Sequence, residues 1–250
     1  MSGKYEKNGF ELPRCTDIID DCTNISFGLK KWAAAEVVRW IRKHGNSWPG
    51  CWLVDDEDLN RAEKAYETTG QTALDVGSEV HNAIEVFLKR EIARKGDGEA
   101  HWDITDPVYA KLSGQAMKAF NAFNAWQKEH DIKPIVLEQT VYSESGCWAG
   151  TCDFLGYFDG KLYVIDWKSS KAFYPEMRYQ VAAYRSAVGD TQLDIVGCGV
   201  LRLDKTDGTP EWKDTSKSYE KDLRIFNRMV DLYFERHPQI AKKAGWNIPF

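Results

Sequence analysis

The sequence predicts an α/β protein: a central mixed β-sheet flanked by helices, with a mostly helical N-terminal part. Apolar residues in the first half of the chain repeat at helical spacing, and Pro134 ends that pattern. The runs that follow are short, β-branched and aromatic, which is typical of strands, and one helical pattern interrupts them. One domain that packs helices against a sheet is the simplest way to bury both patterns.

We expect this single domain to span residues 1–250 in three parts. Residues 1–134 form the mostly helical part, residues 135–203 the sheet core, and residues 204–250 a C-terminal hairpin and helix. A chain of this length buries a sizeable core without needing disulfides or metals to hold it together.

The periodicity predicts four helices before the sheet. In the first, Leu29, Trp32 and Val37 follow helical spacing, and Gly45 is a candidate C-cap. The expected ranges are 28–45, 59–68, 71–90 and 106–130.

Four strands and two more helices are expected after Pro134. Pro175 begins one helix, since proline suits the first helical turn, and Asp207-Gly208 predicts a further turn. The helices are expected at 175–188 and 216–236, and the strands at 135–143, 150–158, 161–168 and 193–203.

Composition excludes several classes of protein. With 43% hydrophobic and 28% charged residues, the chain is neither disordered nor fibrous. No apolar run approaches the roughly 18 residues of a membrane span, and the first residues lack the apolar stretch of a secretory signal. A net charge of −5 argues against a basic nucleic-acid coat protein, although an acidic site that binds cations can still meet phosphate. We expect a cytoplasmic protein with no membrane partner, whose six cysteines are free, reduced thiols.

The most informative local signal is the sequence FDGK at 158–161. Asp159-Gly160 between two strand-like runs predicts a two-residue hairpin loop that pairs Phe158 with Lys161. Continued along both strands, this register places Asp153 directly opposite Asp166. Because side chains alternate along a strand, Lys168 projects from the same face as Asp166.

Two opposed carboxylates on a strand pair repel each other. The repulsion raises the pKa of one of them unless a cation neutralises the pair, and a divalent cation with oxygen ligands would do so. The alternative is an exposed hairpin on which Asp166 and Lys168 are solvated charges. For Asp153 this alternative is less favoured, because aspartate is depleted in strands.

Two further signals mean little alone. His81, in DVGSEVHNAIEVFLKR, would by itself be read as a partly buried structural histidine. Gln180 and Tyr184 are spaced i,i+4 on the 175–188 helix and therefore point the same way.

The order in which these residues follow one another in the sequence is more specific than any one of them. It resembles the PD-(D/E)XK nuclease superfamily, and more narrowly the RecB-type nuclease branch. The segments GSEVHNAIEVFL, AGTCDFLGYFDGKLYVIDWKSS and QVAAYRSA are similar to that branch, from about residue 70 to 190. LPRCTDIIDDCTN and LKKWAAAE resemble the helical leading segment of its phage-type members. The residues that carry the resemblance are His81, Asp153, Asp166, Trp167, Lys168, Gln180 and Tyr184.

The resemblance implies a restriction-endonuclease-like core and a Mg²⁺- or Mn²⁺-dependent phosphodiesterase. It implies that Asp153 and Asp166 are metal ligands, that His81 is an additional ligand, and that the Trp167 carbonyl is a backbone ligand. Lys168 would orient or activate the attacking water and stabilise charge on the phosphate. By the same resemblance, Gln180 and Tyr184 position DNA or brace the metal site.

Three details qualify this resemblance. The third motif is Asp-x-Lys, where many members have Glu-x-Lys. Some relatives hold an iron–sulfur cluster through cysteines that flank the core; the last cysteine here is Cys198, so we expect no such cluster. Glu138 lies on a neighbouring predicted strand, where it is either part of the metal shell or an ordinary strand-face charge.

The 28–45 helix carries a candidate DNA-binding surface. Its cations are Lys30, Lys31, Arg39, Arg42 and Lys43, with Trp32 and Trp40 between them. Cationic grooves with aromatic platforms suit single strands, so these side chains could follow phosphates and stack on bases. The alternative is a solvated face, with Trp32 and Trp40 packed in the core. Cations of the 216–236 helix admit the same two interpretations.

The absence of a GxxxxGK[ST] phosphate loop indicates no helicase motor. The resemblance then implies a stand-alone exonuclease of a bacterium or phage-infected cell. It would act on DNA ends or single strands in replication, repair or recombination. Two alternatives stay open: a catalytically idle nucleic-acid-binding module, and an accessory to a helicase, recombinase or single-strand-binding partner.

Overall fold

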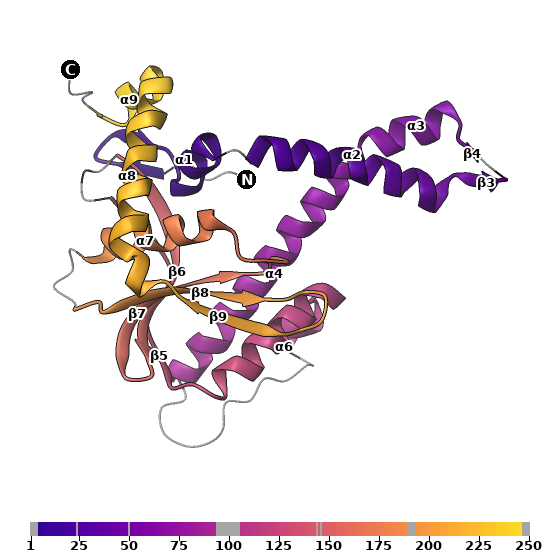
Figure 1. Cartoon of the computed structure of the whole chain (residues 1–250). Helices are drawn as coiled ribbons and strands as arrows, with labels where there is room; N and C mark the ends of the chain where they lie inside the picture. The colour runs from indigo at the N-terminus through magenta and orange to yellow at the C-terminus, as the bar shows by residue number, and fades with distance from the viewer. Residues whose placement is uncertain are drawn as a thin grey trace. The chain divides into compact units, whose positions relative to one another are not determined.

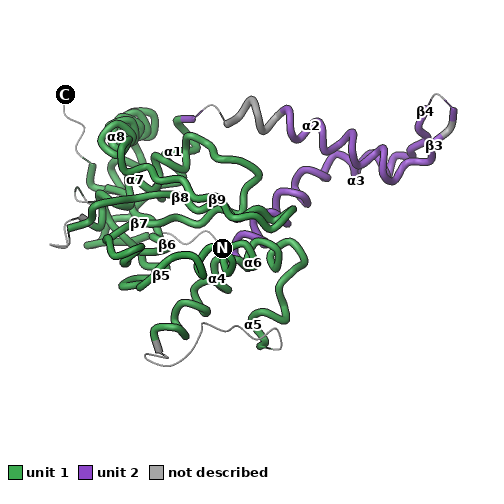
Figure 2. The backbone as a smooth tube through the Cα atoms, turned by 60° about the horizontal axis from the view of Figure 1, so that its bottom comes forward, with its two compact units in different colours: residues 1–22, 79–250 green, residues 23–78 purple. Residues whose placement is uncertain are grey.

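The computed structural model describes residues 5–23, 25–49, 51–93, 106–143, 145, 147–189 and 194–246, apart from the side chains at 25–30, 48, 93 and 189. By its internal contacts the chain forms two compact units (Figure 2). Unit 1 contains residues 1–22 and 79–250, and unit 2 contains residues 23–78. Whether these units fold separately is a different property, so the single-domain organisation stays a prediction.

Unit 1 is built on a five-stranded mixed sheet (Figure 1). β7 and β8 are parallel, and every other neighbouring pair in this sheet is antiparallel. The parallel pair needs a crossover, which α7 (Pro175–Gly189) supplies. This confirms the predicted mixed α/β class. In sheet order the strands are β5 (Ile132–Tyr142), β6 (Ala149–Phe158), β7 (Lys161–Lys168), β8 (Gly197–Leu203) and β9 (Pro210–Asp214).

The β6–β7 hairpin has the predicted register. Phe158 pairs with Lys161, and the ladder continues without a shift to Phe154 and Ile165. The two loop residues have φ of +49° and +76°, as the preferred two-residue turn requires of Asp-Gly. The backbone pairing of the two strands ends at Phe154 and Ile165, one residue before the predicted pair of Asp153 and Asp166.

Helices cover both faces of this sheet (Figure 1). On one face, rings of α6 (Gly114–Gln127) pack against Trp167 of β7: the ring centroids of Phe123 and Trp126 lie 5.5 and 6.2 Å from that of Trp167. On the other face, α7 contacts β5, β6 and β7, and it also packs on α8 (Tyr219–Arg236). Since neighbouring side chains alternate, Asp166 and Lys168 project to the face opposite Trp167.

The N-terminal segment belongs to the same unit. α1 (Cys15–Cys22) contacts α7 and α8, and the Ala149 amide at the start of β6 donates to the Pro13 carbonyl at 3.1 Å. Unit 1 also contains the part of α4 (Ala65–Ala93) from residue 79 onward. Its remaining described elements are β1 (Tyr5–Lys7), β2 (Phe10–Leu12), α5 (Pro107–Ala110), a single 3₁₀ turn (Ser216–Ser218) and α9 (Pro238–Lys243).

The single long helix predicted over 106–130 is wrong. The chain forms α5 and α6 instead, separated by residues 111–113. Ser113 begins the second helix, because its Oγ accepts a hydrogen bond from the Ala116 amide at 3.3 Å. Serine and Gly114 favour a new helix start over continuation of the old one.

The boundary predicted between the 59–68 and 71–90 helices is also misplaced. α3 (Asp56–Glu63) ends before Lys64, and α4 (Ala65–Ala93) runs through Gly70. A glycine inside a helix costs only about 1 kcal/mol relative to alanine, which a long helix tolerates. Asp55 caps α3 by accepting from the Asp58 amide at 2.7 Å.

Unit 2 is helical and has a small core. It contains α2 (Ile25–His44), the short β3 (Asn46–Trp48) and β4 (Cys51–Leu53), α3 and the first part of α4. Helix α2 confirms the predicted 28–45 helix, and the Gly45 amide donates to the Ile41 carbonyl at its end. Among the described residues of this unit, the buried apolar ones are Ala62, Ala65 and Val76.

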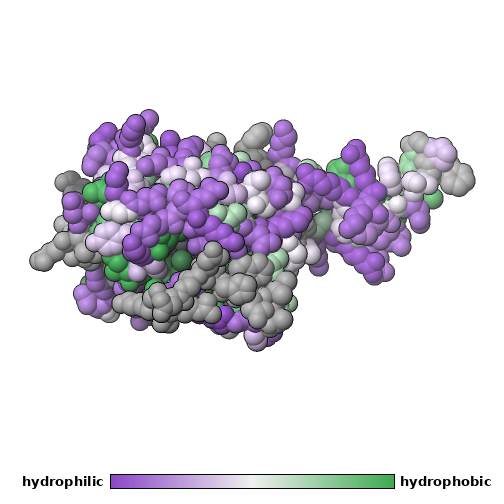
Figure 3. Space-filling view, turned by 90° about the horizontal axis from the view of Figure 1, so that it is seen from below, coloured by the Kyte–Doolittle hydropathy of each residue, from purple (hydrophilic) through white to green (hydrophobic). Residues whose placement is uncertain are grey.

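Within the described part of the chain, no helix combines the length and apolar character needed to cross a membrane. On the face shown in Figure 3, hydrophilic residues predominate and hydrophobic residues occupy small areas. All six cysteines carry free thiols, and four of them, Cys15, Cys147, Cys152 and Cys198, are buried.

Candidate metal centre

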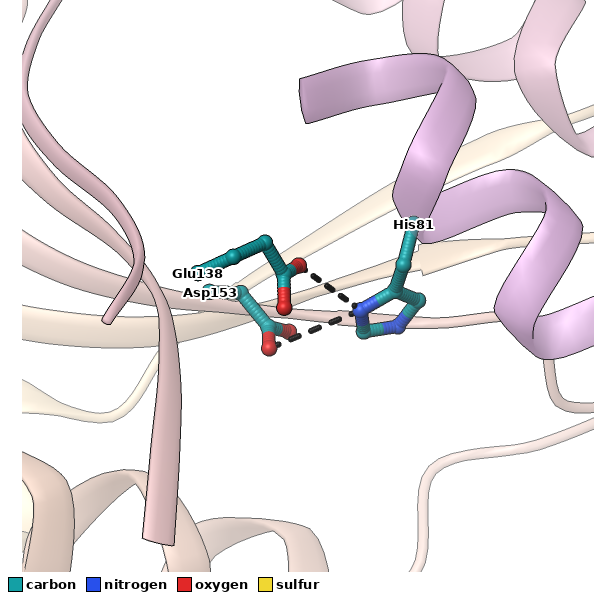
Figure 4. A group of neighbouring side chains, drawn as sticks. All are labelled: His81, Glu138 and Asp153. Atoms are coloured by element: carbon teal, nitrogen blue, oxygen red, sulfur yellow. Dashed lines mark hydrogen bonds and ion pairs between the residues drawn. The ribbon is translucent and has the colours of Figure 1, made fainter. Parts of the chain in front are cut away.

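Three side chains from three elements of unit 1 converge on one point (Figure 4). The Nδ1 atom of His81 on α4 lies 3.1 Å from Oε1 of Glu138 on β5. The same nitrogen lies 3.5 Å from Oδ1 of Asp153 on β6. One potential ligand atom from each residue falls within 4.8 Å of the others, which is close enough to share a single metal ion.

Glu138 reaches this point through an irregular backbone. Its neighbours Leu137 and Gln139 pair with Phe154 and Cys152, so the register sets Glu138 opposite Asp153. Glu138 itself has φ of +48°, in the left-handed region that side chains other than glycine rarely adopt. Such strain costs on the order of 1–3 kcal/mol and gathers at functional sites.

The peptide unit of Trp167 links Asp153 to His81. The Trp167 amide donates to Oδ2 of Asp153 at 2.8 Å, and the Trp167 carbonyl lies 3.1 Å from Nε2 of His81. Asp153 is buried, which raises the pKa of its carboxyl, while the charges of His81 and Lys168 oppose that rise. β7 therefore supplies a backbone donor and a backbone acceptor to the site.

Asp166 and Lys168 form an ion pair beside this group. Nζ of Lys168 lies 2.7 Å from Oδ2 of Asp166, whose side chain is only 1% exposed. Oδ1 of Asp166 is buried with no hydrogen-bond partner among the residues that the structure describes. Burial raises the pKa of Asp166 to about 6, with Asp153 adding to the rise and Lys168 opposing it. The alternative of solvated charges is thus wrong for Asp166.

Carboxylates raise the pKa of both cationic groups of the site, and Asp153 acts on each of them. Burial disfavours the charged form of His81, but Asp153 and Glu138 outweigh it and raise the pKa of the imidazole to about 9. Burial likewise opposes charge on Lys168, yet Asp166 and Asp153 raise the pKa of its ammonium. The site therefore attracts positive charge strongly.

The donor set could hold a metal ion, and it does not select one. Carboxylate and carbonyl oxygens suit Mg²⁺ and Mn²⁺, whereas an imidazole nitrogen suits zinc, copper, iron and nickel. His81, Glu138 and Asp153 supply the clustered ligand atoms. Within the described chain, Asp166 is outside this cluster and pairs with Lys168 instead.

Gln180 and Tyr184 hydrogen-bond to each other on α7. Nε2 of Gln180 donates to the Tyr184 hydroxyl at 2.9 Å, and Tyr184 is buried. Burial raises the pKa of the phenol well above its usual value, and the charges of Asp166 and Asp153 add to this. A Cβ on Gly150 would lie 2.6 Å from the Tyr184 ring, so glycine in β6 makes room for it.

Sequence patterns gave no indication of Cys15 as a neighbour of the site. This buried thiol of α1 has a pKa well above its usual value, chiefly through burial, with Asp166 raising it and Lys168 lowering it. This electrostatic interaction depends on α1 packing near a sheet whose strands lie far away in the sequence. The sequence also left two interpretations of Glu138, a metal-shell residue or an ordinary strand-face charge. Its contact with His81 depends on the position of α4, which the sequence does not give.

The predicted DNA-binding cations lie on α2 in unit 2. Lys31, Arg39 and Arg42 are exposed, and Arg39 forms an ion pair with Glu36. The side chain of Lys30 lies outside the described residues. Trp32 and Trp40 are half-buried, so neither occupies a fully buried core position.

Comparison with known proteins adds nothing to this geometry. No family model matches the sequence, and no curated protein matches it. The assignment of the site therefore depends on the distances, burial and charges described above.

Proposed function

We propose that this protein is a divalent-metal-dependent DNA nuclease of the PD-(D/E)XK superfamily, similar to its RecB-type branch. The observation that carries the proposal is the convergence of His81, Glu138 and Asp153 beside the ion pair of Lys168 with the buried Asp166. Two buried aspartates, an adjacent glutamate and a lysine are costly to assemble for stability alone, because each unneutralised charge loses hydration. Hydrolysis of a phosphodiester uses all of them.

The topology supports the finer fold assignment. A β6–β7 hairpin carries the two aspartates, and a parallel β7–α7–β8 unit follows it. The resemblance implies a restriction-endonuclease-like core with a central mixed sheet flanked by helices, and we propose that core here. The helix that supplies Gln180 and Tyr184 is the crossover of the same unit.

The metal of this proposal is Mg²⁺ or Mn²⁺, held by His81, Glu138 and Asp153, with Asp166 and the Trp167 carbonyl adjoining. When bound, such an ion acts as a Lewis acid on a phosphoryl oxygen and lowers the pKa of a coordinated water. The backbone positions the ligands of this ion. Strands β5 and β6 carry the carboxylates of Glu138 and Asp153, and the Trp167 amide donates a hydrogen bond to one oxygen of Asp153.

Lys168 is the residue that we propose acts on the phosphate. Asp166 holds its ammonium at 2.7 Å and favours the charged form. A fixed ammonium beside the metal ligands stabilises the negative charge that develops on a phosphoryl group in the transition state. Its place on β7, two residues after Asp166, also lets it orient the attacking water by hydrogen bonding.

Gln180 and Tyr184 are proposed to brace the site or position the DNA. The proposed substrate is a DNA end or single strand, and the proposed activity is exonucleolytic, within replication, repair or recombination. A helicase, recombinase or single-strand-binding protein is the kind of partner that would supply such ends.

The test is cleavage of end-labelled single- and double-stranded DNA, linear and circular, with Mg²⁺, with Mn²⁺ and with EDTA. Wild type is compared with Lys168→Ala and with a matched control, Lys161→Ala, which removes an exposed lysine at the other end of the same strand. We expect wild type and control to degrade linear DNA only when metal is present. The cleavage rate of Lys168→Ala should be at least about 100-fold lower. Circular dichroism checks that both variants fold.

The other outcomes decide between the alternatives. Cleavage of circles would identify an endonuclease. DNA binding without cleavage under either metal would contradict the nuclease and favour an idle binding module. Neither cleavage nor binding would favour an accessory subunit. Full activity of Lys168→Ala would remove this lysine from the mechanism.

A further inference from the structure

Unit 2 contains a cationic groove that has no role in the metal centre. It has a volume of about 640 Å³ and lies between α2 on one side and α3 with the start of α4 on the other. Four cationic side chains line it against one carboxylate, that of Glu36. The cations are Arg39, Lys43, Arg61 and Lys64, and His44 lies beside them.

The ion pairs of this groove leave two of its charges uncompensated. Glu36 pairs with Arg39, and Glu57 of α3 pairs with Arg61. Lys43 and Lys64 are exposed, and neither forms an ion pair within the described part of the chain. An anion entering the groove would therefore meet two free ammonium groups without displacing an existing partner.

The groove also contains aromatic and hydroxyl groups. The rings of Trp40 and His44 stack with centroids 4.5 Å apart, and Thr68 and Thr69 lie on the opposite wall. Flat rings beside ammonium groups suit a strand whose bases are unpaired, since a base can stack while the backbone phosphates meet the cations. A paired duplex hides the faces of its bases and gains only the phosphate contacts.

We infer that this groove binds single-stranded DNA, with Lys43 and Lys64 on successive phosphates and the Trp40–His44 stack against a base. The inference deepens the proposed nuclease function, on which its choice of ligand rests. Of the cations predicted to bind DNA, it selects Lys43 and leaves out Lys31 and Arg42, and it adds Lys64 at the end of α3. Arg39 pairs with Glu36 and is not free for phosphate.

The experiment measures binding of a fluorescein-labelled oligothymidylate to the full chain by fluorescence anisotropy. EDTA is present, so that the DNA is not cleaved and binding is measured separately from cleavage. The variant is Lys43→Ala/Lys64→Ala. The matched control is Lys111→Ala/Lys128→Ala, which removes two exposed lysines of unit 1. Losing two phosphate contacts should weaken binding about 25-fold at about 0.1 M salt, roughly fivefold for each contact. The slope of log Kd against log salt should fall by about 1.4.

The control should bind as wild type does, and unlabelled oligothymidylate should compete better than duplex of the same length. No binding by wild type, or equal affinity of the variant and the control, would overturn the inference. Equal competition by duplex would overturn the single-strand assignment. Because cleavage is assayed separately, a chain that binds through the groove without cutting DNA fails only the proposed function. A chain that cuts DNA but binds equally well without the two lysines fails only this inference.

Discussion

At the scale of single residues, Glu138 is the most informative position. Its left-handed backbone is unfavourable for a residue with a side chain, yet it turns the carboxylate toward His81 and Asp153. Glycine would adopt the same φ at no steric cost. The strained residue is thus one whose carboxylate belongs to the candidate metal centre, and backbone strain of this kind is typical of functional sites.

Replacing Glu138 separates these two effects. Glu138→Gln removes the charge and keeps the backbone strain, whereas Glu138→Gly removes both. We expect the glycine variant to be more stable to urea than the glutamine variant by about 1 kcal/mol. Both should lose Mn²⁺ affinity in calorimetric titrations. A glycine variant that is the less stable of the two would show that the φ of Glu138 is not strained, and unchanged Mn²⁺ affinity would remove Glu138 from the site.

At the scale of elements, the close approach of α7 to β6 fixes Tyr184. Gly150 allows it, because a Cβ there would overlap the Tyr184 ring at 2.6 Å. Helix α7 is not free to move away from β6, because it also packs on α8 and β7. Spacing within α7 predicted that Gln180 and Tyr184 share a face, but not which strand residue they meet.

Gly150→Ala should therefore destabilise the protein by about 1–3 kcal/mol through overpacking. Gly114→Ala is the matched control, because nothing lies within 4 Å of a Cβ at that helical position. The control should be neutral or stabilising by up to about 1 kcal/mol. Urea denaturation measures both, and equal stability of the two variants would mean that Tyr184 is loosely held.

The turn between β8 and β9 gives a pH dependence. Asp204 accepts from the Thr206 amide at 2.7 Å and pairs with Arg202 at 2.7 Å, and these contacts lower its pKa. A lowered folded-state pKa contributes stability that is complete above the unfolded value of about 4 and is lost as pH falls through the folded pKa. Asp204→Asn should cost about 1.5 kcal/mol at pH 7, and the difference from wild type should shrink below about pH 4.

The matched control for this turn is Glu129→Gln, an exposed carboxylate without an ion pair in the described chain. Its stability should follow wild type at every pH. A difference between Asp204→Asn and wild type that stays constant from pH 7 to pH 2 would contradict the assignment of the pKa shift to Asp204.

Local sequence signals predicted the sheet and the hairpin, and long-range packing decided the rest. Asp159-Gly160 set the register of β6 and β7 because a two-residue loop permits only one. The same reasoning did not show that Glu138 meets His81, since that contact depends on where α4 lies against the sheet. Ser113 caps a new helix inside a segment whose apolar residues keep helical spacing throughout. Counting apolar residues does not detect such a cap.

At the scale of the whole molecule, the two units differ in how much they bury. Unit 1 contains the large apolar cluster around α7, α8 and the sheet, whereas the described part of unit 2 buries only Ala62, Ala65 and Val76. Local stability follows buried apolar contact, so the helices of unit 2 should open more readily than the central strands.

Hydrogen exchange tests this difference. Amides of α2 and α3 should exchange at least tenfold faster than those of β6 and β7 at neutral pH. If the groove binds oligothymidylate, its addition in EDTA should slow exchange in α2, in α3 and at the start of α4. Equal protection throughout would indicate that the whole chain opens in one transition, as the single-domain prediction requires.

The docking of α1 has a consequence for synthesis. Ile18 and Ile19 are buried in the same cluster as α8, and the Arg236 guanidinium at the far end of α8 pairs with Asp21 at 2.8 Å. During synthesis α1 leaves the ribosome long before α8, so its apolar face is fully covered only after residues 219–236 have been made. A nascent chain that stops before residue 219 leaves part of this face exposed, which makes the truncated product a target for chaperones and for aggregation.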